Sequence, residues 1–353
     1  MVRARNLQES ITQTPRIVIN GTEIGDNCAP YIIAEGCNNH NGNLEIAKSM
    51  AYEAKKAGAN CIKFQHHIVN EEMLHDGFEA TYDCIEKTSL TISEHKELKE
   101  YCDNIGITYL CTPFSYKAAC ELEEAGIAYA YKIGSGEMTD IPTLKKIAAF
   151  GKPMIISTGM STIEEIDRTY EALKDIAEFA FTNCISEYPP KYEDMNIGVI
   201  SKMKERYPNI VIGHSDHTTD LYTSFAAVAL GACIIEKHFV LDKNMNAPDI
   251  AVSIDPKDLK ELVDGCKKIF LSMGSKKKVH LLEQPCRDWA FRSIIATRDI
   301  KKGELIDEST IWSKRPGTGI PSYRMNELLG KIALVDIKAN TIIHPNDIKD
   351  FNL

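Results

Sequence analysis

The chain has 353 residues, of which 44% are hydrophobic, and its formal net charge is −9. This size and hydrophobic content fit a barrel of roughly 250 residues followed by one small domain. The negative charge argues against non-specific binding to nucleic acid or to an anionic membrane. No apolar stretch approaches the roughly 18 residues that span a bilayer.

The N-terminal residues and the cysteines indicate the compartment. Residues 1–14 are polar and lack the apolar segment of a signal peptide. The 11 cysteines are scattered and form no C-x-x-C pair. Cys61, Cys111 and Cys233 lie in apolar runs, where a free cysteine packs as a small hydrophobe. We therefore expect a cytoplasmic protein with reduced thiols.

The first predicted element is a β-hairpin. Residues Arg16–Ile24 alternate between apolar and polar side chains around Asn20-Gly21, a sequence that favours a tight turn. We expect residues 1–30 to carry this hairpin as a cap that closes the bottom of the following domain.

Eight short apolar runs come next, separated by segments with helical periodicity. They are Tyr31–Glu35, Cys61–Gln65, Thr108–Thr112, Ala130–Ile133, Met154–Thr158, Phe179–Cys184, Ile210–Gly213 and Cys233–His238. Eight repeated βα units predict an α/β fold, a (β/α)₈ TIM barrel over residues 31–273. One helix between them is expected to begin at Ser161, with Glu164 completing a capping box.

The pattern changes after Met273. Residues 274–290 are charged and turn-like, which predicts a polar linker. Short β-type runs follow at Ser293–Ala296, Ala333–Ile337 and Thr341–Ile343, so residues 291–353 are expected to form a small β-rich domain. About 60 residues are marginal as an independent unit, and we expect this domain to dock on the barrel or on a partner subunit.

Two histidines end the last two barrel runs. In the final run Glu236 and His238 project to one face, while Lys237 between them projects to the other. The active site of a barrel lies at the carboxyl ends of its strands. His217 and His238, with carboxylates nearby, could hold a divalent metal there, whereas a structural role is the alternative for each histidine alone.

Two lysines also lie inside apolar runs. Lys63 shares a face with Gln65, and Lys132 lies in the fourth run. Lysine is rarely buried unless it is paired. Two ammonium groups at a barrel mouth suit a phosphate or carboxylate ligand, and pairing with Glu35 or Glu236 is the alternative. Hydroxyl donors for such a ligand are Thr112, Ser135, Ser157, Ser186 and Ser215.

Several motifs, taken together, resemble the sialic acid (nonulosonic acid) synthase family over nearly the whole chain. They include Asn39-His40-Asn41-Gly42, Ile62-Lys63-Phe64-Gln65, Lys132-Ile133-Gly134-Ser135, Ser157-Thr158-Gly159-Met160, Ser215-Asp216-His217-Thr218 and Glu236-Lys237-His238-Phe239. The tail, Phe291–Leu353, is similar to the antifreeze-like (SAF) domain that follows the barrel in this family, including Lys314-Arg315-Pro316-Gly317.

The resemblance implies a reaction. Phosphoenolpyruvate condenses with an open-chain N-acylated amino sugar to give a nine-carbon acid and phosphate. His217 and His238 would be catalytic and hold Mn²⁺, with Mg²⁺ or Co²⁺ as alternatives. Glu35 would lie near the developing charge, and Lys63 and Lys132 would bind phosphoenolpyruvate. The further substrate-binding residues would be Gln65, Thr112, Ser135, Glu137, Ser157, Ser186, Tyr188, Ser215, Glu236 and Asp249.

The resemblance also implies a domain-swapped homodimer. Arg315 occupies the position of a family arginine that reaches the partner subunit's site and contacts the N-acyl group. The sequence departs from the family at Gly36-Cys37, where Ile-Gly is usual, and at Ile250, where many members have a histidine after Asp249.

These departures leave two acceptor sugars open, N-acetylmannosamine and a 2,4-diacetamido-2,4,6-trideoxyhexose. Two alternative functions also stay open. Another phosphoenolpyruvate-dependent 3-deoxy-ulosonate synthase would need further basic residues for a phosphorylated sugar, and it would lack the tail. A catalytically inactive glycan-binding barrel would not need the lysines, histidines and Glu35 that this chain retains.

Overall fold

The computed structural model describes residues 14–352, which form two compact units divided between Gly274 and Ser275. This division lies one residue after the predicted end of the barrel domain. Among the described helices, none combines the length and the apolar character needed to cross a bilayer.

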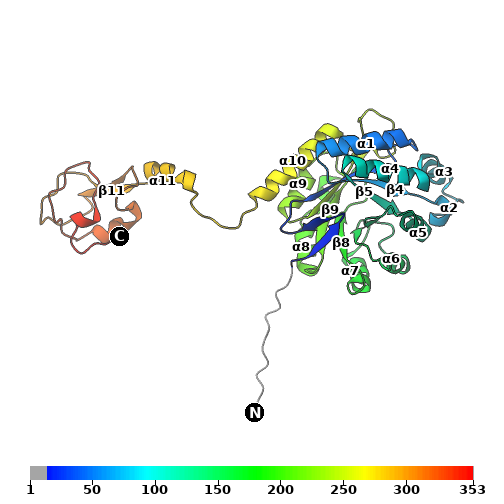
Figure 1. The fold of residues 1–353 in the computed structure, drawn as a ribbon. Coiled ribbons are helices and arrows are strands. Elements are labelled where there is room, and N and C mark those ends of the chain that lie inside the picture. The colour runs from blue at the N-terminus through cyan, green and yellow to red at the C-terminus, as the bar shows by residue number, and fades with distance from the viewer. Residues whose placement is uncertain (1–13, 353) are drawn as a thin grey trace, which may run out of the picture. The chain divides into compact units, whose positions relative to one another are not determined.

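The first unit is a closed barrel of eight parallel strands in the order β10-β3-β4-β5-β6-β7-β8-β9 (Figure 1). The strands are β3 (Tyr31–Cys37), β4 (Cys61–His66), β5 (Thr108–Pro113), β6 (Tyr131–Ile133), β7 (Met154–Ser157), β8 (Phe179–Cys184), β9 (Val211–Asp216) and β10 (Ile234–His238). Nearly every strand residue is buried, as expected where helices cover the outside and side chains fill the inside. The predicted (β/α)₈ fold is confirmed.

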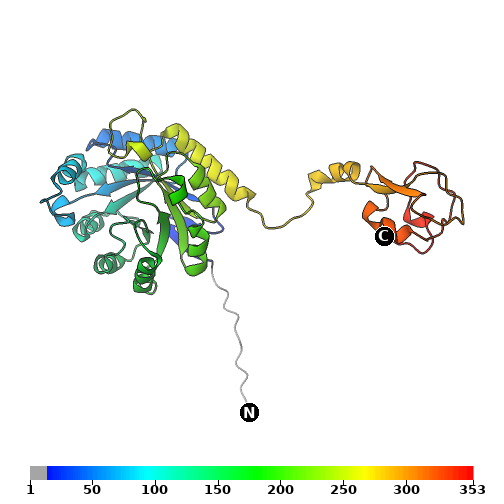
Figure 2. The same ribbon diagram turned by 180° about the vertical axis from the view of Figure 1, so that it is seen from behind.

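Helices surround the strands (Figures 1 and 2). They are α1 (Leu44–Ala57), α4 (Ile92–Ile105), α5 (Tyr116–Glu124), α6 (Ile141–Ala148), α7 (Ile163–Leu173), α8 (Val199–Arg206), α9 (Tyr222–Ala229) and α10 (Pro256–Ser272). Two further helices, α2 (Val69–Glu72) and α3 (Glu79–Thr88), lie in the connection from β4 to α4, and η1 (Tyr192–Asp194) and η2 (Ile250–Val252) are short 3₁₀ turns. The capping box of α7 pairs Thr162 with Glu165, so the predicted cap at Ser161 is wrong by one residue.

The predicted hairpin is present. β1 (Arg16–Ile19) and β2 (Thr22–Gly25) pair antiparallel around Asn20 and Gly21, which both adopt positive φ. Three hairpin isoleucines, Ile17, Ile19 and Ile24, pack in one buried cluster with residues near the starts of the barrel strands. The hairpin thereby closes the end of the barrel opposite the carboxyl ends of the strands.

The second unit contains α11 (Gln284–Ala290), β11 (Ser293–Ala296), β12 (Ile311–Lys314), α12 (Met325–Leu328) and the 3₁₀ turns η3 (Leu281–Glu283), η4 (Ser322–Arg324) and η5 (Pro345–Asp347). β11 matches its prediction, but Ala333–Ile337 and Thr341–Ile343 are not regular strands. They make isolated bridges instead. Ala333, Ile337 and Ile343 pack in the unit's own core, whereas Leu334 and Val335 are exposed. Helix α11 occupies the end of the predicted linker.

Candidate active site

A cavity of about 350 Å³ lies at the carboxyl ends of the barrel strands. Every predicted site residue of the barrel lines it. The lining comprises Glu35, Lys63, Gln65, Thr112, Phe114, Lys132, Gly134, Ser135, Gly136, Glu137, Ser157, Met160, Cys184, Ser186, Tyr188, Ser215, His217, Glu236, His238 and Asp249. The strand order thus gathers residues from all eight strands into one place.

Lys63 lies at the centre of a buried charge network. It stands opposite Glu35 in the register of β3 and β4, and the two side chains form an ion pair. The Lys63 ammonium also donates to Thr112 Oγ1 at 3.0 Å and lies 3.7 Å from Glu236 Oε1. Pairing with both carboxylates, the alternative left open by the sequence, is therefore present. The same ammonium nevertheless lines the cavity.

Lys132 approaches the same Glu236 oxygen as Lys63. Its Nζ lies 3.5 Å from Glu236 Oε1 and donates to Ser157 Oγ at 2.6 Å. The hydroxyl of Ser215 also donates to Glu236 Oε1, at 3.3 Å. One carboxylate thus holds two ammonium groups beside a row of hydroxyls.

Burial changes the protonation of these groups. It lowers the pKa of Lys63 to about 8, although Glu236 opposes the shift. Burial would raise the pKa of Glu236, but the ammonium groups of Lys132 and Lys63 hold it below its usual value. The carboxylate is therefore ionised at neutral pH, and Lys63 titrates close to the physiological range.

The two predicted metal ligands lie side by side. The rings of His217 and His238 have centroids 5.1 Å apart. His217 Nδ1 is 2.7 Å from the carbonyl oxygen of Ile185, which only accepts, so Nδ1 carries the proton and Nε2 is free. Burial lowers the pKa of His238 well below its usual value, which keeps this imidazole neutral. An imidazole with one nitrogen fixed by a carbonyl or carboxylate is typical of metal-binding histidines.

Tyr188 covers the histidine pair. Its ring stacks on His217 at 4.2 Å and meets His238 edge-on at 5.7 Å. The aromatic ring therefore limits the space above the imidazoles.

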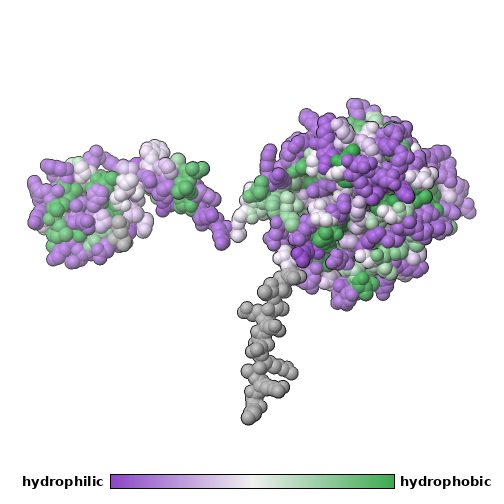
Figure 3. Space-filling view, in the orientation of Figure 1, coloured by the Kyte–Doolittle hydropathy of each residue, from purple (hydrophilic) through white to green (hydrophobic). Residues whose placement is uncertain are grey.

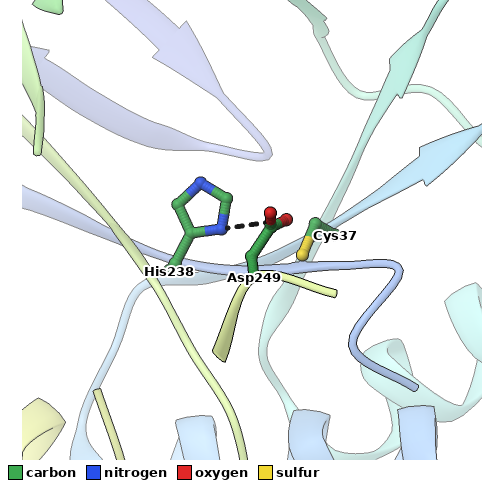
Figure 4. A group of neighbouring side chains, drawn as sticks. All are labelled: Cys37, His238 and Asp249. Atoms are coloured by element: carbon green, nitrogen blue, oxygen red, sulfur yellow. Dashed lines mark ion pairs between the residues drawn. The ribbon is translucent and has the colours of Figure 1, made fainter. Parts of the chain in front are cut away.

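A third group of side chains converges on His238. Its Nδ1 lies 3.5 Å from Asp249 Oδ2, and Cys37 lies beside the same carboxylate (Figure 4). Sequence reasoning placed Asp249 in the site and noted Cys37 only as a departure from the family pattern. Its position two residues after Glu35, at the end of a barrel strand, is the signal that could have found it.

Other lining residues were also missed by sequence reasoning. Phe114, Met160 and Cys184 follow or end barrel strands and line the cavity, and Cys184 Sγ lies 3.9 Å from His217 Nδ1. Burial would lower the pKa of His217, but the contact with Cys184 raises it above the usual value.

A buried ion pair supports the strands that carry the histidines. Lys237 and Asp216 each precede a histidine, are fully buried, and lie 3.3 Å apart on the outer side of the barrel. Lys237 also donates to the carbonyl oxygen of Thr218, and Asp216 accepts from Thr223 and Ser224 at 2.7 and 2.6 Å. This network fixes β9 against β10 directly beside the paired imidazoles.

Arg315 belongs to the second unit. Its guanidinium lies 4.5 Å from the centroid of the Trp289 ring, and its Nε donates to the carbonyl oxygen of Ala290 at 3.1 Å. The arginine is thus held at the end of helix α11.

Comparison with known proteins identifies the family. A model of the NeuB family matches residues 50–278, and a SAF domain matches residues 291–349. The chain belongs to the NeuB family of sialic (nonulosonic) acid synthases. The expected family and its C-terminal SAF domain are confirmed.

Individual NeuB relatives cover almost the whole chain. The N,N'-diacetyllegionaminic acid synthase of Campylobacter jejuni is 37% identical over 88% of this chain and 98% of its own. The human N-acetylneuraminate-9-phosphate synthase is 33% identical over 92% of this chain and 94% of its own. A crystal structure of N-acetylneuraminic acid synthetase from Leptospira borgpetersenii, in complex with citrate, has a TM-score of 0.73 and 31% identity and covers 77% of this chain and 95% of that one.

Proposed function

We propose that this NeuB protein condenses phosphoenolpyruvate with an open-chain N-acylated amino sugar, giving a nine-carbon sialic-type acid and phosphate. The observation that carries the proposal is the pair of buried ammonium groups, Lys63 and Lys132, held by Glu236 in a cavity that the paired imidazoles also line. An anionic three-carbon substrate suits the lysines and hydroxyls.

The chain's own groups would position and protonate the reactants. The lysines and hydroxyls hold the carboxylate and phosphate of phosphoenolpyruvate so that its C3 attacks the aldehyde carbon. Positive charge then develops at C2, where the Glu35 carboxylate stabilises it or accepts a proton from the incoming water. The tetrahedral species that results breaks the C2–O bond and releases phosphate.

A divalent metal is part of the proposal, with Mn²⁺ preferred and Mg²⁺ or Co²⁺ as alternatives. Nε2 of His217 is free, and a neutral His238 lies beside it, so the donor set fits such an ion. When bound, the metal would polarise the aldehyde oxygen as a Lewis acid.

The acceptor is proposed to be an unphosphorylated sugar. Among the described residues that line the cavity, Lys63 and Lys132 are the only lysines, and there is no arginine. Phosphoenolpyruvate engages both lysines, which leaves no cationic side chain there for a phosphate group on the sugar. Phe114, Met160 and Tyr188 add uncharged surface that suits deoxy and acylated carbons. Between the two open sugars, the Campylobacter relative supports the 2,4-diacetamido-2,4,6-trideoxyhexose, with N-acetylmannosamine as the alternative.

A domain-swapped homodimer completes the proposal, with Arg315 acting on the partner's acceptor sugar. Its support is the apolar surface on the segment before the SAF core. Leu281 and Leu282 are 89% and 92% exposed, and Trp289 is 64% exposed. Figure 3 shows green, hydrophobic atoms at the place where Figure 1 labels α11. Exposed leucines and a tryptophan on one segment are typical of an interface.

A phosphate-release assay tests the proposed reaction. The full chain is given phosphoenolpyruvate, Mn²⁺ and each of the two sugars in parallel. We expect release with one sugar and none after a chelator is added. Sugar binding without phosphate release would indicate the inactive glycan-binding alternative, and release with a phosphorylated pentose or tetrose alone would indicate another ulosonate synthase.

A further inference from the structure

The motif Asn39-His40-Asn41-Gly42 follows β3, and none of its four residues is among the described residues that line the cavity. Its asparagines bond the connection from β10 to α10, which runs from Phe239 to Asp255. We propose that Asn39 is a positioning residue for the acceptor sugar, because it holds this connection so that Asp249 faces the cavity. This inference rests on the proposed function and names one determinant of its sugar binding.

The Asn39 side chain bonds the connection at three residues. Its Nδ2 donates to the carbonyl oxygen of Phe239 and to Ser253 Oγ, both at 3.1 Å. Its Oδ1 accepts from the backbone N–H of Asp249 at 3.0 Å. The Ser253 hydroxyl in turn donates to the carbonyl oxygen of Asp249 at 2.7 Å. Asn39 is fully buried, so water does not compete for these hydrogen bonds.

The partners fix the orientation of the Asn39 amide. A backbone N–H only donates and a carbonyl oxygen only accepts, so the amide cannot be turned over without losing both bonds. The N–H of Asp249 is bound directly, and its carbonyl oxygen is bound through Ser253. The main chain of Asp249 is therefore held on both sides, and its carboxylate faces His238 at the cavity wall (Figure 4).

The rest of the motif makes a firm base for this clamp. Asn41 Nδ2 donates to the carbonyl oxygen of Asn246 at 2.7 Å, a further tie to the same connection. Gly42 has φ of 72°, and a Cβ there would lie 2.8 Å from the carbonyl oxygen of Lys87, so the turn requires glycine. The next residue, Asn43, is the N-cap of α1. The turn after β3 is thus fixed between a strand and a helix.

The connection needs such support because its one regular element in the described chain is the 3₁₀ turn η2. Asp249 is its single residue among the described residues that line the cavity, so a shift of the connection reaches the cavity through this carboxylate. The proposed phosphoenolpyruvate ligands Lys63 and Lys132 lie on β4 and β6, and in the described chain the Asn39 side chain bonds neither strand. Loss of Asn39 should therefore weaken binding of the sugar and spare phosphoenolpyruvate.

The first test requires no enzymatic activity. Hydrogen–deuterium exchange, followed by mass spectrometry, is measured on the full-length wild type and on Asn39→Ala and Ser253→Ala. Exchange in residues 239–253 should be faster by on the order of tenfold in Asn39→Ala, which leaves the buried Asp249 N–H without its acceptor. Ser253→Ala should show a smaller increase, because the bond from Asp249 to Asn39 remains.

Asn60→Ala is the matched control. Asn60 Oδ1 accepts from the backbone N–H of Ile32 at 2.8 Å, at the opposite end of the barrel. This variant also loses an asparagine hydrogen bond, but residues 239–253 should exchange as in the wild type. Unchanged exchange there in Asn39→Ala, or an equal increase in Asn60→Ala, would overturn the proposal. If Asn39→Ala does not fold, wild-type exchange in Ser253→Ala would overturn it.

The second test measures both KM values with Mn²⁺ present. Asn39→Ala should raise KM for the sugar at least about tenfold and change KM for phosphoenolpyruvate by less than about twofold. Ser253→Ala should shift the sugar KM in the same direction by less, and Asn60→Ala should keep both wild-type values. Equal changes in the two KM values would indicate a purely structural role and overturn the proposal. An inactive wild type would refute the proposed function instead, and the exchange data then still show whether Asn39 holds the connection.

Discussion

Glu35 and Lys63 stand opposite each other on neighbouring parallel strands and form a buried ion pair. The exposed fraction of the accessible surface is 1% for Glu35 and 3% for Lys63. Removing a charged group from water costs several kcal/mol, about enough that a buried charge needs an opposite charge beside it. The cavity therefore carries a carboxylate and an ammonium already in place beside the proposed phosphoenolpyruvate site.

Glu35→Gln should lower kcat by about 10²–10⁴-fold, the range that general acid–base groups contribute. Gln keeps the volume but cannot accept a proton from water. The affinity for phosphoenolpyruvate should stay the same or increase, because the Lys63 ammonium loses one competing carboxylate. Steady-state kinetics and calorimetric binding measure the two quantities. Glu124→Gln, at an exposed position of the outer helix α5, is the control and should behave as the wild type.

The affinity for phosphoenolpyruvate should fall as pH rises through about 8. Burial lowers the pKa of Lys63 to about 8, so its ammonium is fully charged below this pH and is lost above it. A phosphate with its second pKa near 6 stays fully ionised over this range, so the ligand's charge is constant. Calorimetry without the sugar should show a rising Kd above pH 8 and proton uptake on binding. A Kd unchanged from pH 7 to 9.5 would contradict this assignment, and Lys63→Arg should remove the dependence.

Asp216→Asn should destabilise the barrel by about 3–5 kcal/mol, because it leaves the Lys237 ammonium buried without its counter-charge. Urea denaturation, followed by circular dichroism, measures the decrease in the free energy of unfolding. Asp264→Asn removes a partner from the exposed Lys260 pair and should leave the denaturation midpoint unchanged. Equal denaturation midpoints for the two variants would show that the Asp216–Lys237 ion pair does not stabilise the barrel.

Arg315→Ala should raise KM for the sugar far more than KM for phosphoenolpyruvate. If Arg315 acts on the partner's site, mixing Arg315→Ala with His217→Ala chains should restore about a quarter of wild-type activity at low sugar concentration, through mixed dimers with one intact site. Equal changes in both KM values, or no restoration on mixing after subunit exchange, would refute action in trans.

The barrel was predictable because each strand is a short apolar run and a parallel barrel buries both faces of every strand. His217, His238, Lys63 and Lys132 stood out as polar residues at or inside such runs. The group formed by Cys37 was not predictable. It depends on a register shift in β3 and on the return of Asp249 from a loop over 200 residues away, and neither leaves a periodic signal.

Boundaries and the small domain were harder to predict. The helix cap at Thr162 follows a serine that could cap equally well, so the sequence alone left a one-residue ambiguity. In the second unit, Ala333 and Ile337 have strand-like spacing, but they serve a small core in which turns interrupt the ladders. Short apolar runs there indicate burial and do not determine strand pairing.

The central claim is that phosphoenolpyruvate loses phosphate by cleavage of its C2–O bond while C3 joins the sugar. The most direct test is turnover of phosphoenolpyruvate labelled with ¹⁸O at the bridging oxygen, in the presence of Mn²⁺ and the accepted sugar. We predict that mass spectrometry finds the label in the released phosphate and none in the nine-carbon acid. Label retained in the acid, or phosphate released without any sugar, would contradict the account.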